Sequence, residues 1–307
     1  MGNYYYKSEN NKFIIYDGDN VLTTPSGKAV VTIYETLAKR IVFDLERYGM
    51  NFRSISSILS WHFTMIDNFA PREHAEVEDI LFNSFLKIKR QRTPDSESYW
   101  QSFSYNGPAH VTISAVLDAI NYTDDILDAE GKPTTRVRWE CSCLQAVCGG
   151  CAMIINGVPA LACNTFVDEV TKKDLVLEPL SKFPVVADLM VDRSMIYENL
   201  NSAKAYIESR SVSSKQNHAH QYSVAKCLKC GLCLEVCPNY HAGGTFFGAV
   251  FANESYLITT QSAEKPVQVV KEYKTHFGAG CSKALSCQSV CPIGIETITS
   301  ILNMNRK

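Results

Sequence analysis

Twelve cysteines are the residues whose types and spacing point most directly to chemistry. All of them lie between Cys141 and Cys291, in three groups. The first group is Cys141, Cys143, Cys148, Cys151 and Cys163, the second is Cys227, Cys230, Cys233 and Cys237, and the third is Cys281, Cys287 and Cys291. In a reducing compartment, such clustering is typical of metal or cofactor ligation rather than of disulfides.

In the first group, Cys143, Cys148 and Cys151 have the C-x4-C-x2-C spacing of plant-type 2Fe-2S ferredoxins, and Cys163 follows as the distant fourth ligand. Gly149 and Gly150 would let the backbone approach the cluster closely, so that N-H groups point at the sulfurs. A structural zinc site is the alternative, although zinc sites favour C-x2-C knuckles at both ends. Cys141 is left over, as a small thiol beside the loop or as a substitute for Cys143.

The second group has the C-x2-C-x2-C-x3-C-P spacing of bacterial ferredoxins, in which the fourth cysteine serves the other cluster. The third group repeats this template with Ala284 at the second cysteine position. Crossing the fourth cysteines predicts one site with four thiolates and another with three. The four-thiolate site comprises Cys227, Cys230, Cys233 and Cys291, and the three-thiolate site comprises Cys237, Cys281 and Cys287.

Four thiolates predict a 4Fe-4S cluster. The three-thiolate site faces the methyl group of Ala284, which cannot hold a fourth iron, so a 3Fe-4S cluster is expected there. The alternatives are a 4Fe-4S cluster with a ligand other than cysteine, or an accidental spacing. The three sites together use all of the cysteines except Cys141.

Length and charge narrow the classes of protein to consider. The 307 residues are enough for two or three domains. A formal net charge of -2 argues against a nucleic-acid partner, which would require a basic surface. There is no run of about 18 apolar residues that could span a membrane. The start of the chain has neither a basic region with an apolar core nor a twin arginine, so we expect no export signal.

Beyond the cysteines, several segments resemble the iron-sulfur subunits of succinate dehydrogenases and fumarate reductases. The resemblance runs from about Leu86 to the last residue. It is carried by the segments 139–144, 147–149, 177–180, 183–186, 191–194, 237–240 and 304–306. In these details the chain looks most like the bacterial proteins that use menaquinone and a cytochrome b anchor with two haems.

This resemblance implies an α+β fold, with a 2Fe-2S ferredoxin-like beta-grasp domain followed by a mainly α-helical ferredoxin-type domain. It also implies two partners, a flavoprotein subunit that carries FAD and the substrate chemistry, and a membrane-anchor cytochrome b. The chain would relay electrons between them, through 2Fe-2S, 4Fe-4S and 3Fe-4S clusters, as a peripheral subunit on the cytoplasmic face of the cell membrane. Relatives that act with other flavoproteins, on glycolate or heterodisulfides, are the alternative.

Residues next to the second and third cysteine groups differ from those in the members of the family that use ubiquinone. Those proteins have tryptophan soon after the Cys-Pro of the second group and histidine beside the first cysteine of the third. This chain has Asn239-Tyr240-His241 and Ser282 there. We therefore expect electrons to pass to a haem of the anchor, and Tyr240 and His241 are either contacts there or ordinary packed or surface residues.

Local patterns divide the chain into residues 1–85, an extension of unknown role; 86–190, the 2Fe-2S domain; and 191–307, the helical domain. The 2Fe-2S domain is predicted to contain strands over 86–90, 99–105 and 153–155 and a helix over 112–120. The extension is predicted to be a small α/β module, with a hairpin over 13–24 and helices over 32–48 and 55–69. Thr32 and Glu35 have the spacing of a capping box for the first helix.

Overall fold

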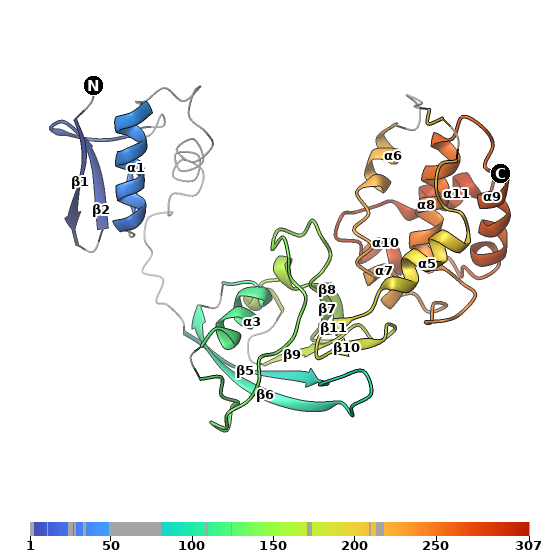
Figure 1. The fold of residues 1–307 in the computed structure, drawn as a ribbon, viewed down its shortest axis with the longest axis horizontal. Helices are drawn as coiled ribbons and strands as arrows, with labels where there is room; N and C mark the ends of the chain where they lie inside the picture. The colour runs from blue at the N-terminus through green and yellow to red at the C-terminus, as the bar shows by residue number, and fades with distance from the viewer. Residues whose placement is uncertain are drawn as a thin grey trace. The chain divides into compact units, whose positions relative to one another are not determined.

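The computed structural model describes residues 3–10, 12–23, 27, 29–32, 35–48, 81–108, 110–123, 125–170, 174–208, 210–212 and 218–306. The chain divides into two compact units, Met1–Glu78 and Asp79–Lys307. Figure 1 shows the elements of both units along the chain. The predicted helix over 55–69 lies outside the described residues.

The N-terminal unit is a small antiparallel sheet packed against one helix. Its elements are β1 (Tyr4–Glu9), β2 (Lys12–Asp17), β3 (Asn20–Val21), β4 (Val31–Thr32) and α1 (Glu35–Tyr48). Strand β2 pairs with each of the other three strands, which confirms the predicted hairpin. Ile15, Ile41 and Leu45 are buried between the sheet and α1. The prediction that Thr32 caps the helix was wrong, because Thr32 pairs with Phe13 in the sheet and the helix begins at Glu35.

The second unit begins with a five-stranded sheet in the order β6-β5-β9-β7-β8. The strands are β5 (Leu81–Arg90), β6 (Tyr99–Pro108), β7 (Ala152–Ile155), β8 (Val158–Leu161) and β9 (Leu175–Glu178). Strand β9 runs parallel to β5, whereas the other pairs are antiparallel. Strand β5 begins earlier than predicted, because residues from Leu81 onward pair with the far end of β6.

Helix α3 (Ile113–Asn121) packs against this sheet. The Thr112 side chain caps it by accepting a hydrogen bond from the Ala115 N-H at 3.3 Å. Its buried face includes Ile113, Val116 and Leu117, which lie in one hydrophobic core with the sheet residues Leu86 and Ile88. A sheet with one helix beside it is the predicted beta-grasp arrangement.

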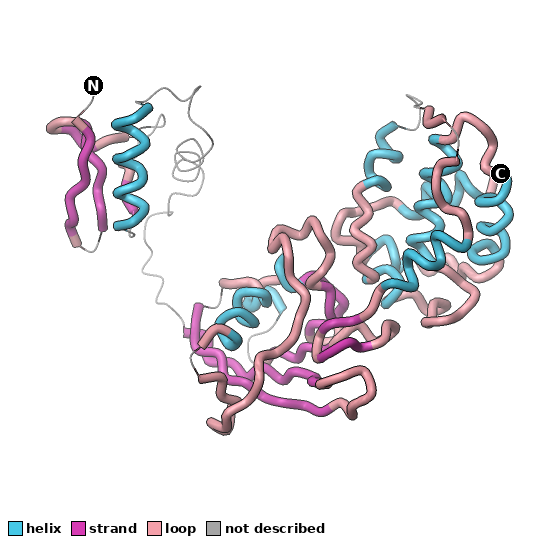
Figure 2. Tube along the Cα trace, in the orientation of Figure 1, coloured by secondary structure: helices cyan, strands magenta, loops and turns pink. Residues whose placement is uncertain are grey.

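The remainder of the second unit is mainly helical, as Figure 2 shows in cyan. After the short strands β10 (Val185–Ala187) and β11 (Met190–Val191), the helices of eight or more residues are α5 (Ser194–Ser202), α6 (His218–Ala225), α8 (Gly248–Gln261) and α11 (Thr297–Met304). The shorter ones are α7 (Leu232–Glu235), α9 (Val267–Tyr273) and α10 (Ser286–Ser289), with a π-helical turn at Lys274–Gly278. Helix α8 is buried over most of its length and contacts α6, α7, α9 and α11. The α+β fold class is therefore confirmed.

Candidate metal centres

The four predicted 2Fe-2S ligands lie in the loop before β7 and directly after the hairpin of β7 and β8. Cys143, Cys148 and Cys151 precede β7, and Cys163 lies in the short 3-10 helix Ala162–Asn164 after β8. Backbone N-H groups point at all four sulfurs. Cys143 Sγ accepts from Gln145 N at 3.3 Å and from Val147 N at 3.4 Å. Cys148 Sγ accepts from Gly150 N at 3.4 Å, and Cys151 Sγ accepts from Cys163 N at 3.4 Å. Cys163 Sγ accepts from Ala146 N at 3.3 Å.

The shape of this loop explains why its N-H groups face inward. Leu144 and Ala146 have φ angles of 53° and 57°, in the left-handed region, and Gly149 has a φ of 76°. A residue other than glycine costs roughly 1–2 kcal/mol in that conformation, so such residues concentrate at functional sites. Here the strained backbone aims its dipoles at sulfur, an arrangement that stabilises thiolates and a negatively charged cluster.

The thiols of this loop have opposite electrostatic environments. The N-H groups of Gln145 and Val147 lower the pKa of Cys143 to about 7. Burial raises the pKa of Cys151 to about 12, because a buried thiolate has lost its hydration. Iron would supply the positive charge that a deprotonated Cys151 needs, so the donor set fits a cationic metal core.

Cys141 lies outside this arrangement. The residue is exposed overall, although partial desolvation of its thiol and the nearby charge of Asp118 raise its pKa. Cys143 accepts two N-H groups of the loop. These contacts favour Cys143 over Cys141 as the ligand.

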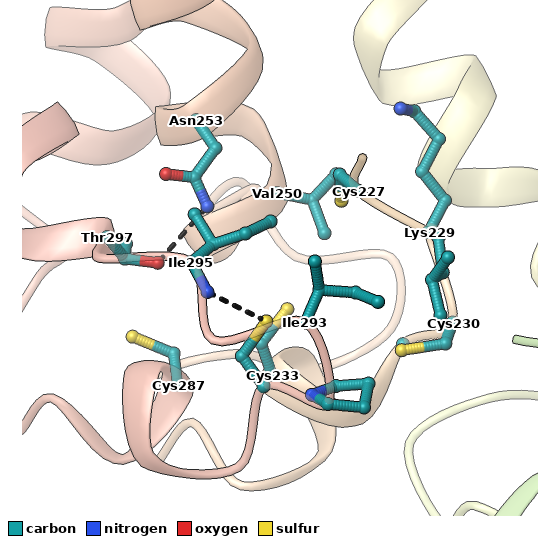
Figure 3. Close-up of a pocket in the computed structure, with 14 residues that line it drawn as sticks. Cys227, Lys229, Cys230, Cys233, Val250, Asn253, Cys287, Ile293, Ile295 and Thr297 are labelled. Carbon is teal, nitrogen blue, oxygen red and sulfur yellow. Dashed lines mark hydrogen bonds between the residues drawn. The ribbon is translucent and has the colours of Figure 1, made fainter. Parts of the chain in front are cut away.

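The second and third groups meet around an enclosed cavity in the helical part. The cavity is lined by five cysteines, namely Cys227, Cys230, Cys233, Cys287 and Cys291. Figure 3 draws these five and labels four of them, with Val250, Ile293 and Ile295 nearby. Four of the five are the predicted 4Fe-4S ligands, and Val250 of α8 together with Ile293 and Ile295 after Cys291 makes much of the lining apolar.

Burial dominates the electrostatics of this cavity. It raises the pKa of Cys230 to about 11 and that of Cys233 well above its ordinary value. The Leu232 N-H opposes this shift by lowering the pKa of Cys230. The Ile295 N-H donates to Cys291 Sγ at 3.5 Å. As in the first loop, the donors suit a metal core that compensates buried negative charge.

The two remaining cysteines, Cys237 and Cys281, lie close enough to Cys287 to perturb its thiol. Burial raises the pKa of Cys287 to about 11, with further contributions from Cys237 and then Cys281. The structure therefore brings together the three predicted ligands of the last site. Cys287 also lines the cavity of the four-thiolate site, so the two sites are neighbours.

The second and third groups have the same backbone conformation at equivalent positions. Lys229 and Gly231 flank Cys230 with φ angles of 52° and 89°, and each run then enters a short helix, α7 or α10. Lys283 and Leu285 flank Ala284 with φ angles of 60° and 58°. Ala284 therefore occupies the backbone position that corresponds to Cys230.

Two charged side chains that the sequence interpretation did not single out connect the ferredoxin-like part to the cysteine loops of the helical part. Arg193 donates to Gly149 O at 2.9 Å and to Cys230 O at 3.3 Å. Lys182 donates through Nζ to Cys237 O, and its backbone N-H donates to the buried Glu235 carboxylate at 3.1 Å. Arg193 lies in a segment that carries the resemblance, but no spacing rule connects it with a distant loop.

Tyr240 is a packed residue. It is 3% exposed, its hydroxyl donates to Met195 Sδ at 3.1 Å, and burial raises its pKa to about 12. His241 is exposed. The interpretation of Tyr240 as a packed side chain is therefore the better one.

Known protein families match both cysteine-containing parts of the chain. A family described as a 2Fe-2S iron-sulfur cluster binding domain matches residues 85–198, and a 4Fe-4S dicluster domain matches residues 223–295. The chain is 31% identical over 230 residues to the succinate dehydrogenase iron-sulfur subunit of Bacillus subtilis, a match that covers 71% of this chain and 90% of that protein. The chain belongs to the succinate dehydrogenase and fumarate reductase iron-sulfur subunit family. A fumarate reductase iron-sulfur subunit of Escherichia coli is also 31% identical, over 70% of this chain and 90% of its own length.

A solved structure supports the fold of this family member. The match is to the Mycobacterium smegmatis Sdh1 complex in the apo form, with a TM-score of 0.59 and 20% identity, and it covers 74% of this chain and 95% of the other. Among the described residues, no helix is both long and apolar enough to cross a membrane. The described residues also contain no group of three or more Cys, His, Asp or Glu side chains placed to hold a single metal ion.

Proposed function

We propose that this chain relays electrons between a flavoprotein that oxidises succinate or reduces fumarate and a membrane-anchor cytochrome b. Iron-sulfur clusters accept and release single electrons, and three such groups in one chain form a relay. The observations that support this proposal are the N-H groups that point at the sulfurs of Cys143, Cys148, Cys151 and Cys163, and the apolar cavity lined by Cys227, Cys230, Cys233, Cys287 and Cys291.

The first set, Cys143, Cys148, Cys151 and Cys163, would hold the 2Fe-2S cluster. The N-H groups of the loop would hydrogen-bond to the ligand sulfurs and stabilise the negative charge of the reduced form. The second set, Cys227, Cys230, Cys233 and Cys291, would hold the 4Fe-4S cluster. Its mainly apolar surroundings would limit the access of water to the cluster and lower the local dielectric.

The third set, Cys237, Cys281 and Cys287, would hold a 3Fe-4S cluster. The proposal rests on the equivalence of Ala284 and Cys230 in two backbone segments of the same conformation. A methyl group has no lone pair with which to bind iron, so the fourth corner lacks a protein ligand. A substitute ligand from elsewhere would have to reach that corner.

The flavoprotein would carry FAD and the substrate chemistry. The anchor would be a cytochrome b of the type that works with menaquinone, and this chain would lie peripherally on the cytoplasmic face of the membrane. Where the ubiquinone-using relatives have tryptophan and histidine, this chain has Asn239-Tyr240-His241 and Ser282. Tyr240 packs against Met195. These features favour direct delivery of electrons to a haem of the anchor.

Isolation of the tagged chain from cells that also express its neighbours tests this proposal. We expect a flavoprotein with covalently bound FAD to co-purify, and succinate to bleach the visible absorbance of the clusters and to reduce an added dye. Malonate, a competitive analogue of succinate, should abolish both changes. Reduction by glycolate or a dithiol in place of succinate would contradict the assignment to this substrate class.

A further inference from the structure

Arg193 joins the two cysteine loops that belong to different parts of the second unit. It immediately precedes α5, and its side chain is 12% exposed. One terminal nitrogen donates to Gly149 O at 2.9 Å and to Cys230 O at 3.3 Å. The other donates to Gly150 O at 3.3 Å and forms an ion pair with Glu140. A single guanidinium group thus bonds to the first loop, to the second, and to the segment before the first.

The planar shape of the guanidinium group makes this possible. Its donors diverge in fixed directions within one plane, whereas a lysine ammonium is a compact point charge at the end of a flexible stem. A lysine at position 193 would retain the charge, but its single nitrogen would have to replace two separate terminal nitrogens that bond to Gly149 O, Cys230 O and Gly150 O. Geometry and charge can therefore be separated by substitution.

Gly149 shows how close the two loops are. A Cβ atom at this position would lie 2.7 Å from Cys230 Cβ, which is shorter than real Cβ contacts, and 3.0 Å from Leu228 Cβ, which is tighter than most of them. Gly149 also has a φ of 76°, which side chains rarely adopt. The backbone between two ligands of the first site therefore contacts a ligand of the second site directly, and Arg193 binds across that contact.

We propose that Arg193 is a positioning residue that sets the separation of the 2Fe-2S and 4Fe-4S sites by holding the Gly149 backbone against Cys230. This inference rests on the proposed function. In the proposed relay, one electron would pass from a 2Fe-2S group held by Cys143, Cys148, Cys151 and Cys163 to a 4Fe-4S group held by Cys227, Cys230, Cys233 and Cys291, and no bond would form or break. Because tunnelling slows steeply with distance, a clamp at this contact controls the rate of that step.

Electron paramagnetic resonance of the purified complex measures this separation without an activity assay. In the fully reduced complex, the 4Fe-4S spin speeds relaxation of the 2Fe-2S spin, and this effect falls steeply with their distance. We expect Arg193→Met to lower the microwave power that half-saturates the 2Fe-2S signal several-fold. Arg193→Lys should lower it less, and Gly149→Ala should also lower it, because the added methyl group pushes the loops apart.

Arg138→Met is the matched control. Arg138 is also near the first loop, but its side chain donates to Arg92 O at 3.3 Å and to no cysteine loop. This variant should saturate as the wild type does. Arg193→Lys and Gly149→Ala keep the test decisive if Arg193→Met fails to load its clusters.

The possible outcomes separate this inference from the proposed function. Wild-type saturation in Arg193→Lys and Gly149→Ala, with both clusters at full spin count, would overturn the positioning role and leave the relay intact. Absence of the two signals from the wild-type complex would overturn the relay itself. A several-fold change in half-saturation power at unchanged spin count supports the positioning role.

Discussion

Asp188 should be one of the most sensitive positions in the second unit. It lies in the turn between β10 and β11 with a φ of 48°, and its carboxylate is 2.8 Å from Arg90 Nε. The two side chains are 3% and 1% exposed. The carboxylate also accepts hydrogen bonds from Gln91 N at 3.0 Å and Arg138 N at 2.9 Å. It therefore ties the end of β5 to the segment that leads into the first cysteine loop.

Asp188→Asn removes the charge while preserving the size of the side chain and its tolerance of the left-handed conformation. Arg90 would remain buried without its counter-charge, and the new amide group would face a backbone donor. Breaking a buried pair in this way costs about 3–5 kcal/mol, which corresponds to a fall in melting temperature of about 6–20 °C for a unit of this size.

Differential scanning fluorimetry of the full chain, at one heating rate for all variants, measures this change. Glu130→Gln is the control, because the Glu130–Lys132 ion pair is 72% and 71% exposed. An exposed pair contributes at most about 1 kcal/mol. If Asp188→Asn melts within a degree of Glu130→Gln, the buried ion pair does not hold the turn and the reasoning is refuted.

Three further predictions concern single side chains. Ala284→Cys should convert the three-iron site to a four-iron site, with loss of the oxidised 3Fe-4S resonance; an unchanged resonance would disprove the equivalence of Ala284 and Cys230. Cys141→Ser should leave the iron content and the 2Fe-2S signal at wild-type levels, because Cys141 is exposed; loss of that signal would make it a ligand. Burial lowers the pKa of His220, whose Nε2 is 2.9 Å from Ser300 Oγ. Stability should therefore fall as the pH drops below the ordinary value of 6.5, and His220→Gln should flatten that dependence in melting scans at several pH values.

Much of the fold could be predicted from short patterns. The predicted strand over 99–105 lies within β6, and the predicted helix over 112–120 matches α3 to within one residue at each end. Cysteine spacing predicted which thiols gather, since ligands of one site recur at fixed offsets along the chain. The α+β fold class was implied by the resemblance to the family.

Other features depend on contacts between distant segments, which no local pattern records. Strand β5 extends to Leu81 only because the far end of β6 pairs with it. Thr32 has the right spacing for a cap, but pairing with Phe13 places it in a strand instead. The partners of Arg193 come from loops far from it in sequence, so its role could not be predicted from composition or spacing.

The central claim is that eleven cysteines form three separate sites for iron-sulfur clusters. Iron and sulfide analysis of anaerobically purified protein, combined with electron paramagnetic resonance of reduced and oxidised samples, tests it directly. We expect a 2Fe-2S signal and a 4Fe-4S contribution after dithionite reduction, and a 3Fe-4S signal after oxidation. Iron sufficient for only one cluster per chain, with a single type of signal, would contradict the account.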